Sequence, residues 1–442
     1  MKIVMIGIGE IGYYLAQVLL SEAHEVVLVE KDDAVYRNAQ EHLDAKIVKG
    51  DGSNALLLEP LIDEKTDLFV AVTDSDAVNI ISVLIARKFG AKRAIARIYD
   101  PTNLIHPLLT DDPKVSVINA EMIVARDLAR LVGNPSAEEV EVFAQGKAEM
   151  VKFQIGEEAK VLNQKLSEIK IPSAWIFIAR IRGGEFQIVS GETSFQAGDQ
   201  VILMGDPHKR KEIEALLGLH QEKVKRVILI GFNAISSKLA VTLRSRDIDV
   251  RFIEANKEIA ERASAEMDGI LVFQGDATSD EILEQAGLDE SVNVLALSND
   301  DETNILISLL AKEKKVRRVV ALAQKPQYKP IIEKIGIDAV VNPRSAMVDE
   351  MIRCIHHEDL SGISILEGGM GRMIEFVVKE KTKFVDTALS QLKWPKGILV
   401  GAIVRGDQLI IPRGDDRIHI GDHLLIFTTR SALSHVKRLF AN

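Results

Sequence analysis

The chain reads Ile3-Val4-Met5-Ile6-Gly7-Ile8-Gly9-Glu10-Ile11-Gly12 near its start. An apolar run typical of a buried strand is followed by a Gly-x-Gly-x-x-Gly turn and then by a helical pattern, the setting in which this motif binds nucleotides. Gly7 is expected to make the tight turn, Gly9 to let the backbone approach a pyrophosphate, and Gly12 to allow close packing of the helix. The backbone N–H groups at the start of that helix would then face the phosphates.

The alternation of short apolar runs with amphipathic helical runs continues after this turn. Buried runs separated by helices indicate a parallel sheet covered on both faces, and therefore a Rossmann-like, doubly wound α/β domain. Residues 76–89 have apolar side chains at helical spacing and end on Gly90, which readily adopts the left-handed conformation that closes a helix. The predicted strands are residues 3–6, 25–29, 46–48, 68–72, 94–98 and 116–118.

A carboxylate stands where the ribose of a bound nucleotide is expected. Glu30 ends the second predicted strand, and its oxygens can accept hydrogen bonds from the ribose 2′- and 3′-hydroxyls. A 2′-phosphate would be repelled there, so Glu30 favours NAD or ATP over NADP. The full predicted cofactor-binding set is Gly7, Ile8, Gly9, Glu10, Ile11, Gly12, Glu30, Asp51, Thr73, Asp74 and Arg97.

The last four of these residues lie at or near the carboxyl ends of other strands, the edge at which open α/β sheets bind ligands. Asp51 can accept a hydrogen bond from an adenine amino group. Arg97 is a charge within an apolar run, and its expected partner is a ligand phosphate or, alternatively, an internal carboxylate. Asp74 and Asp76 are explained equally well as the N-cap and first-turn acids of the following helix.

The sequence repeats itself at an offset of 223 to 225 residues. The strand-and-turn run Ile3-Val4-Met5-Ile6-Gly7 recurs as Val227-Ile228-Leu229-Ile230-Gly231, and Val117-Ile118-Asn119 recurs as Val340-Val341-Asn342. Register is kept over many such blocks, which chance would not produce. The chain is therefore a tandem duplication of a unit of about half its length.

Each copy closes with a β-rich module. Apolar strands at residues 141–143, 148–155, 175–182, 185–189 and 200–204 predict a small α+β lobe, and the turns at residues 182–185 and 405–408 read as hairpins. Residues 218–225 are polar and lightly charged, as in a linker. The predicted order is an N-lobe at 1–134, a C-lobe at 135–220, a second N-lobe at 221–355 and a second C-lobe at 356–442.

The glycine loop of the second copy is altered. It reads Gly231-Phe232-Asn233-Ala234-Ile235-Ser236, and Leu322 replaces the arginine of the first copy. The acids Glu254 and Asp276 are retained in the second copy. A second nucleotide site formed by Gly231, Glu254 and Asp276 is therefore also predicted, but it is the weaker prediction because the glycine loop is altered. Asn233 adopts positive φ more often than most residues, which leaves room for a different ligand. We expect the two copies to divide their functions.

Composition excludes several classes of function. The net charge of −10 opposes general binding to nucleic acid phosphates. No stretch approaches the roughly 20 apolar residues that span a bilayer, and the first residues lack the apolar core of a secretory signal. The single cysteine, Cys354, is expected to be a buried, inert thiol in a helix. These features predict a cytoplasmic protein without internal disulfides.

The sequence offers no catalytic or metal-binding set. A dehydrogenase needs a proton-transfer residue near a carbonyl anchor. Five of the ten histidines, at 208, 356, 357, 419 and 423, are candidates for this role, and they are scattered over separate elements without metal-ligand spacing. A doubled binding domain suits a device that changes shape when occupied. The main alternative is an NAD-dependent oxidoreductase with a duplicated Rossmann domain, and a second is the nucleotide-sensing tail of a potassium efflux antiporter.

The order of these motifs over essentially the whole chain resembles that of tandem RCK domains, which regulate potassium conductance. The resemblance rests on the glycine loop, Glu30, residues 49–53, residues 72–76, residues 95–98 and the later Gly-Asp turns. It implies that Gly7, Gly9, Gly12, Glu30, Asp51, Thr73, Asp74 and Arg97 contact NAD(H) or ATP/ADP.

The same resemblance implies an assembly. Family members of this kind act on the inner face of the cell membrane, as homotetramers that form a ring of eight such domains beneath a TrkH- or TrkG-type potassium channel subunit. Exchange of nucleotides would reshape the ring and so gate potassium flow.

Overall fold

The computed structural model describes residues 1–103, 107–134, 136–219, 224–325, 328–356, 362–366, 371–379, 384–392, 394, 397–429 and 432. The predicted lobe boundaries at 134/135 and 220/221 lie at residues outside the described set. His357 also lies outside it.

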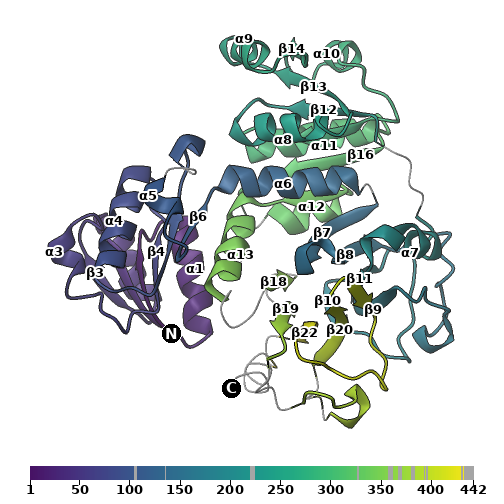
Figure 1. Cartoon of the computed structure of the whole chain (residues 1–442). Helices are drawn as coiled ribbons and strands as arrows, with labels where there is room; N and C mark the ends of the chain where they lie inside the picture. The colour runs from purple at the N-terminus through teal and green to yellow at the C-terminus, as the bar shows by residue number, and fades with distance from the viewer. Residues whose placement is uncertain are drawn as a thin grey trace. The chain divides into compact units, whose positions relative to one another are not determined.

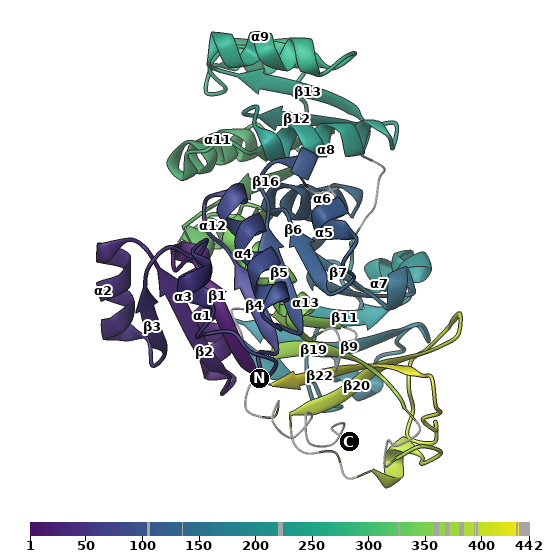
Figure 2. The ribbon, with the colours of Figure 1, turned by 60° about the vertical axis from the view of Figure 1, so that its left-hand side comes forward.

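The first N-lobe is the predicted doubly wound α/β domain. Its six parallel strands lie in the order β3-β2-β1-β4-β5-β6, and Figure 2 shows them side by side. The carboxyl ends of β1 and β4 are therefore neighbours, with the glycine loop between β1 and the first helix. The strands are β1 (Lys2–Ile6), β2 (Glu25–Glu30), β3 (Lys46–Lys49), β4 (Leu68–Ala71), β5 (Arg93–Arg97) and β6 (Val115–Ile118).

The second N-lobe repeats this topology strand for strand. Its order is β14-β13-β12-β15-β16-β17, again all parallel. Each sheet has its own apolar core, so each can position a site independently. The strands are β12 (Arg226–Ile230), β13 (Asp249–Glu254), β14 (Leu271–Gln274), β15 (Asn293–Ala296), β16 (Arg318–Leu322) and β17 (Ala339–Val341).

The helices fall in corresponding places in the two repeats. The first repeat has α1 (Glu10–Ser21), α2 (Asp33–His42), α3 (Ala55–Leu58), α4 (Asp76–Lys88), α5 (Pro107–Thr110), α6 (Ala120–Gly133) and α7 (Arg210–Leu216). The second has α8 (Ala234–Arg244), α9 (Lys257–Glu266), α10 (Asp280–Gln285), α11 (Asp301–Glu313), α12 (Lys329–Lys334) and α13 (Pro343–His356). The predicted helix at 76–89 is thus confirmed, closed by Gly90 at a φ of 105°.

The C-lobes are small antiparallel sheets with strand orders β10-β9-β11-β8-β7 and β18-β19-β22-β20-β21. Both predicted hairpins are present, joining β9 to β10 and β20 to β21. The strands are β7 (Ala137–Phe143), β8 (Ala148–Gln154), β9 (Trp175–Arg182), β10 (Glu185–Ile188), β11 (Gln200–Gly205), β18 (Gly362–Leu366), β19 (Gly371–Val377), β20 (Ile398–Arg405), β21 (Gln408–Ile410) and β22 (His423–Thr429).

The two C-lobes share one apolar cluster. Met150 and Ile178 of the first lobe pack in the same cluster as Met373 and Leu425 of the second. The backbone N–H of Ala144 also donates to Glu375 across the pair. The lobes therefore form a joint core that neither repeat could complete alone.

Two helices leave their own repeat. Compact unit 1 comprises Met1–Ala125 and Asn342–Ile355, so α13 of the second repeat packs with the first sheet. Figure 1 shows α13 beside α1. The rest of the chain forms unit 2, which holds all but the start of α6 together with the second sheet. Each sheet thus receives the closing helix of the other repeat.

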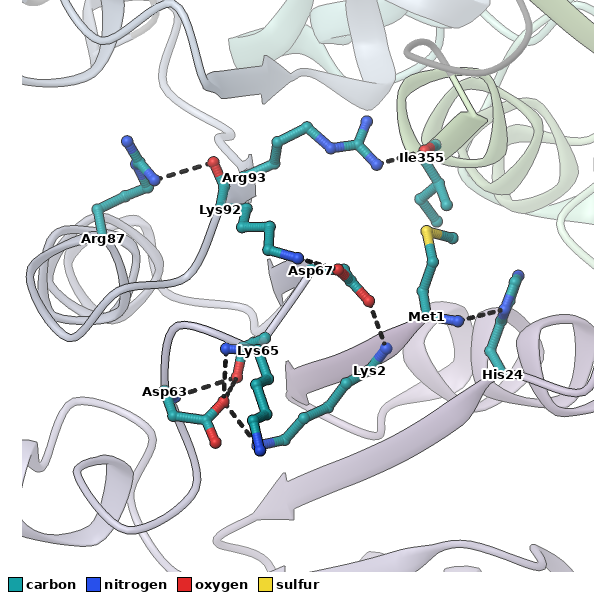
Figure 3. Close-up of polar contacts among 11 residues, drawn as sticks. Met1, Lys2, His24, Asp63, Lys65, Asp67, Arg87, Lys92, Arg93 and Ile355 are labelled. Carbon is teal, nitrogen blue, oxygen red and sulfur yellow. Dashed lines mark hydrogen bonds and ion pairs between the residues drawn. The ribbon is translucent and has the colours of Figure 1, made fainter. Parts of the chain in front are cut away.

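One arginine on each sheet binds the end of the helix it receives. Arg93 of β5 donates to the carbonyls of Cys354 and Ile355, where α13 ends, as Figure 3 shows for Ile355. Arg318, its counterpart on β16, donates to the carbonyls of Leu131, Asn134 and Ala137, at and just beyond the end of α6. The last carbonyls of a helix have no partner within the helix, and a cation there also complements the helix dipole.

The amino-terminal edge of the first sheet is held by a charge network (Figure 3). Asp67 accepts from the backbone N–H of Lys2 at 2.8 Å and from Nζ of Lys92 at 2.7 Å. Asp63 accepts from Nζ of Lys2 at 3.0 Å. These charges tie the strand starts together at the edge opposite the one where the glycine loop lies.

The Gly-Asp turns of the C-lobes prove to be buried ion-pair sites. Asp199 and Asp422 are almost fully buried, and each accepts two hydrogen bonds from one guanidinium, that of Arg182 or Arg405. Burial alone would raise the pKa of Asp422, but Arg405 and the backbone N–H of His419 outweigh it, and the pKa lies below its usual range.

Asp422→Asn is expected to lower the free energy of unfolding by about 2 kcal/mol at pH 7, because a charged hydrogen-bonded pair is lost. The folded-state pKa is depressed, so this contribution is present above the unfolded pKa and is lost as pH falls through the folded pKa. Denaturant unfolding from pH 7 to pH 2.5 measures it. A difference between wild type and variant that does not shrink below about pH 4 would contradict the assignment.

Candidate nucleotide-binding site

The glycine loop has the conformation that the motif predicts. Gly7 has a φ of 86°, and a Cβ there would lie 2.9 Å from the backbone nitrogen of Thr73. A Cβ on Gly12 would overlap the carbonyl oxygen of Gly7. Both positions therefore require glycine, one for its backbone conformation and one for the close approach of helix to strand.

Gly9 differs from these two glycines because neither its backbone conformation nor a close neighbour requires glycine. It is the N-cap of α1 with a φ of −59°, which any residue adopts, and no side chain caps the helix there. A Cβ built on Gly9 meets nothing within 4 Å. The absence of a side chain thus leaves open space in front of the first-turn N–H groups of Glu10 and Ile11, where an anion is favoured.

Glu30 lies beside this loop and is 8% exposed. Its Oε2 accepts from the backbone N–H of Ile8 at 2.6 Å, and its Oε1 accepts from the N–H groups of Lys31 and Asp32. The carboxylate therefore fixes the glycine loop to the end of β2. Oε2 has one further lone pair, so binding of a ribose hydroxyl to that oxygen is compatible with this structural role.

Asn79, on α4, organises the neighbouring strand ends and was not among the predicted residues. Its Oδ1 accepts from the backbone N–H and the hydroxyl of Thr73, at 3.0 and 2.7 Å. Its Nδ2 donates to the carbonyls of Thr73 and Arg97. Asn304 makes the same four bonds to Ser298 and Leu322 in the second repeat. An asparagine kept in register in both copies was the signal that could have revealed it.

Asp74 and Asp76 were predicted as the possible N-cap and first-turn acids of α4, and only the first-turn position of Asp76 is confirmed. The N-cap is Ser75, whose Oγ accepts from the N–H of Val78, so Asp74 is not the cap. Asp76 is in the first turn as expected, but its carboxylate also accepts from the N–H groups of Tyr99 and Asp100. Asp76 therefore holds the loop after β5, and Asp301 does the same in the second repeat.

Arg97 makes no direct ion pair with a carboxylate among the described residues, although Glu121, Asp74 and Asp76 attract its charge. Its guanidinium carbon lies 4.1 Å from the centre of the Tyr99 ring, and its Nε is buried without a hydrogen-bond acceptor. Burial lowers the pKa of Arg97, although an arginine remains charged at neutral pH. The internal-carboxylate alternative is therefore not realised as a direct ion pair among the described residues.

Asp51 is exposed at the end of β3 and accepts from the hydroxyl and backbone N–H of Ser53, which lower its pKa. Asp276 makes the equivalent bonds to Thr278. The sheet topology brings the glycine loop, Glu30 and Thr73 to one edge, flanked by Asp51 just after β3 and by Arg97 at the end of β5.

The second repeat closes the corresponding space. Asn233, the counterpart of Gly9, caps α8, and its Oδ1 accepts from the N–H groups of Ile235 and Ser236. Its φ is −151°, so Asn233 does not use the positive φ that was open to it and serves as a helix cap. Gly231 and Glu254 otherwise repeat the first copy, Glu254 accepting from the N–H of Phe232.

Other candidate groups are engaged elsewhere. Cys354 is half-buried, and burial raises the pKa of its thiol to about 11. Nδ1 of His423 lies 2.7 Å from Glu375. Over the described part of the chain, no cluster of His, Cys, Asp and Glu could hold a metal ion, and no helix is long and apolar enough to cross a membrane.

The fold defines a tandem α/β protein with two Rossmann-like lobes, each followed by a small antiparallel lobe. The TrkA-N domain model matches residues 3–118 and 227–343, and the TrkA-C domain model matches residues 150–218 and 373–441. The chain belongs to the TrkA family of potassium-uptake proteins.

Relatives match over the full length. The chain is 33% identical to "Trk system potassium uptake protein TrkA homolog 1" of Methanosarcina mazei and 34% identical to the TrkA homolog of Archaeoglobus fulgidus, with 100% of each chain covered. Among solved structures, the "GsuK channel bound to NAD" matches with a TM-score of 0.61 at 20% identity, covering 100% of this chain and 79% of that one. At that identity the structural match shows the shared RCK fold alone.

Proposed function

We propose that this protein is a nucleotide-sensing regulatory subunit of a Trk-type potassium uptake system, and that the first repeat binds NAD(H) or ATP/ADP. The observation that carries the proposal is the uncapped start of α1, with open space over Gly9 beside the buried Glu30. Phosphates are suited to that helix start, and ribose hydroxyls to Glu30. A structure of similar fold carries NAD, which supports the same class of ligand.

The contacts in this proposal follow from position. Gly7, Ile8, Gly9, Glu10, Ile11 and Gly12 form the phosphate loop, Asp51, Thr73 and Asp74 line the strand ends, and Arg97 supplies a cation. The site formed by Gly231, Glu254 and Asp276 binds more weakly or not at all, because Asn233 already satisfies the N–H groups that a phosphate would need.

Self-association has its own support. Ile81 and Leu84 are exposed on α4, and Leu306 and Leu309 are exposed at the same two positions of α11. Paired apolar residues kept outside on both copies favour contact with further copies of the chain. A homotetramer on the inner face of the membrane, beneath a TrkH- or TrkG-type subunit, would place eight such N-lobes in one ring.

The action proposed is a shift between conformations and includes no chemical step. A ligand moves such an equilibrium only by binding one conformation better, and a tenfold preference is worth about 1.4 kcal/mol per site. The lobes at 1–134, 135–220, 221–355 and 356–442 are the working parts, and catalytic residues are not proposed.

The test is Gly9→Asp. The new carboxylate would cap α1 and repel phosphate, so we expect the fold to persist while the thermal shift with ATP, ADP and NADH disappears. In wild type, ligand at 100 times its dissociation constant stabilises by about 2.7 kcal/mol, a shift of several degrees.

Asn233→Asp is the matched control, because it adds the same charge at the same place in the second repeat and keeps the cap. It should leave the nucleotide shift intact. Potassium uptake by cells carrying the chain with its membrane subunit gives the functional reading, and normal nucleotide-dependent uptake with Gly9→Asp would refute the proposal.

A further inference from the structure

The start of α1 receives a charged residue from the other repeat. Arg344, on the first turn of α13, forms an ion pair with Glu10, the first residue of α1. Both residues belong to compact unit 1. The two are far apart in the sequence, and only the exchange of α13 between the repeats brings them together.

The pair has an unusual arrangement for a phosphate site. Glu10 is 69% exposed and is the first-turn acid of α1, directly after Gly9, where a Cβ would meet nothing within 4 Å. A phosphate placed there would be repelled by Glu10 unless the carboxylate were neutralised. Arg344 neutralises it.

Arg344 also has N–H donors that its ion pair with Glu10 does not use. A guanidinium has five N–H donors in a planar fork that matches phosphate. Among the described residues Glu10 is the partner of Arg344, so most of these donors are unused. The residue at the same place in the first repeat is Glu121, of opposite charge, so a cation at this position is particular to α13.

We propose that Arg344 contacts the phosphate groups of the nucleotide bound by the first repeat, taking them in exchange for Glu10. This inference rests on the proposed function of the Gly9 site. It makes Arg344 a specificity residue that distinguishes nucleotides by their phosphate charge. It also makes the second repeat a direct participant in binding, since the ligand would hold α13 against α1.

The test is calorimetric titration of the full chain with adenosine, AMP, ADP and ATP. Arg344→Gln should weaken ATP binding at least tenfold, weaken ADP less, and leave adenosine within twofold. Glu10→Gln should strengthen ATP binding severalfold, because the competing carboxylate is gone. Arg353→Gln is the matched control, since it removes the same charge from the same helix near its other end.

Equal ATP affinities for Arg344→Gln and Arg353→Gln would overturn this inference while leaving the nucleotide site in place. Loss of adenosine binding in step with ATP would overturn it as well, because phosphate contact would not be the cause. A wild-type chain that binds none of the four ligands would overturn the proposed function itself, and the inference with it.

Discussion

Arg318→Met is expected to lower the free energy of unfolding of the second compact unit by about 3–5 kcal/mol. Arg318 is 3% exposed and donates to three carbonyls at and beyond the end of α6. Methionine fills similar volume but donates nothing, so these buried acceptors would be left unpaired. Denaturant unfolding of wild type and variant measures the difference.

The duplication supplies a matched comparison. Arg93→Met removes the counterpart that binds two carbonyls of α13 from a less buried position, so its cost should be about 1–2 kcal/mol. Equal losses for the two variants, or a smaller loss for Arg318→Met, would show that the bonds of Arg318 to α6 do not stabilise the unit as inferred.

Asn79→Ala is expected to have the second large effect, on stability and on nucleotide binding together. Four hydrogen bonds of a fully buried side chain are lost, which costs about 2–4 kcal/mol. Thr73, whose backbone abuts Gly7, loses its anchor, and so does the end of β5 at Arg97. We expect nucleotide affinity to fall at least tenfold, measured by titration below the unfolding transition.

Asn304→Ala separates the two effects. It breaks the same four bonds in the second repeat, so it should cost similar stability. Nucleotide affinity should remain near that of wild type, because Asn233 already fills the corresponding space there. Equal loss of affinity in both variants would mean that Asn79 acts on stability alone, or that both repeats bind ligand.

Much of the fold could be predicted because its signals are local. The buried strands of both sheets are continuous apolar runs, and the hairpins follow from turn residues between them. The glycine loop was predictable for the same reason. Gly7 and Gly12 meet steric limits set by their immediate surroundings, which no other residue satisfies.

Parts of the site could not be predicted, because the sequence does not show which of several nearby polar groups reaches a given backbone N–H. Asp74 looked like a helix cap, yet Ser75 has the geometry to reach the N–H of Val78. Asn233 looked like a residue suited to positive φ, but an extended backbone lets its side chain cap α8. In both cases the result depends on which nearby oxygen reaches a backbone N–H group. A difference of a fraction of an ångström decides it.

The sequence by itself determined the duplication, the order of the lobes, the two parallel sheets and the glycine loop that distinguishes the first repeat. Only the tertiary structure decided which helix closes which sheet. Both repeats carry an arginine at the same position to bind a helix end, so either helix satisfies the local pattern. The exchange of α6 and α13, and with it the meeting of Arg344 and Glu10, depends on long-range packing that local periodicity does not encode.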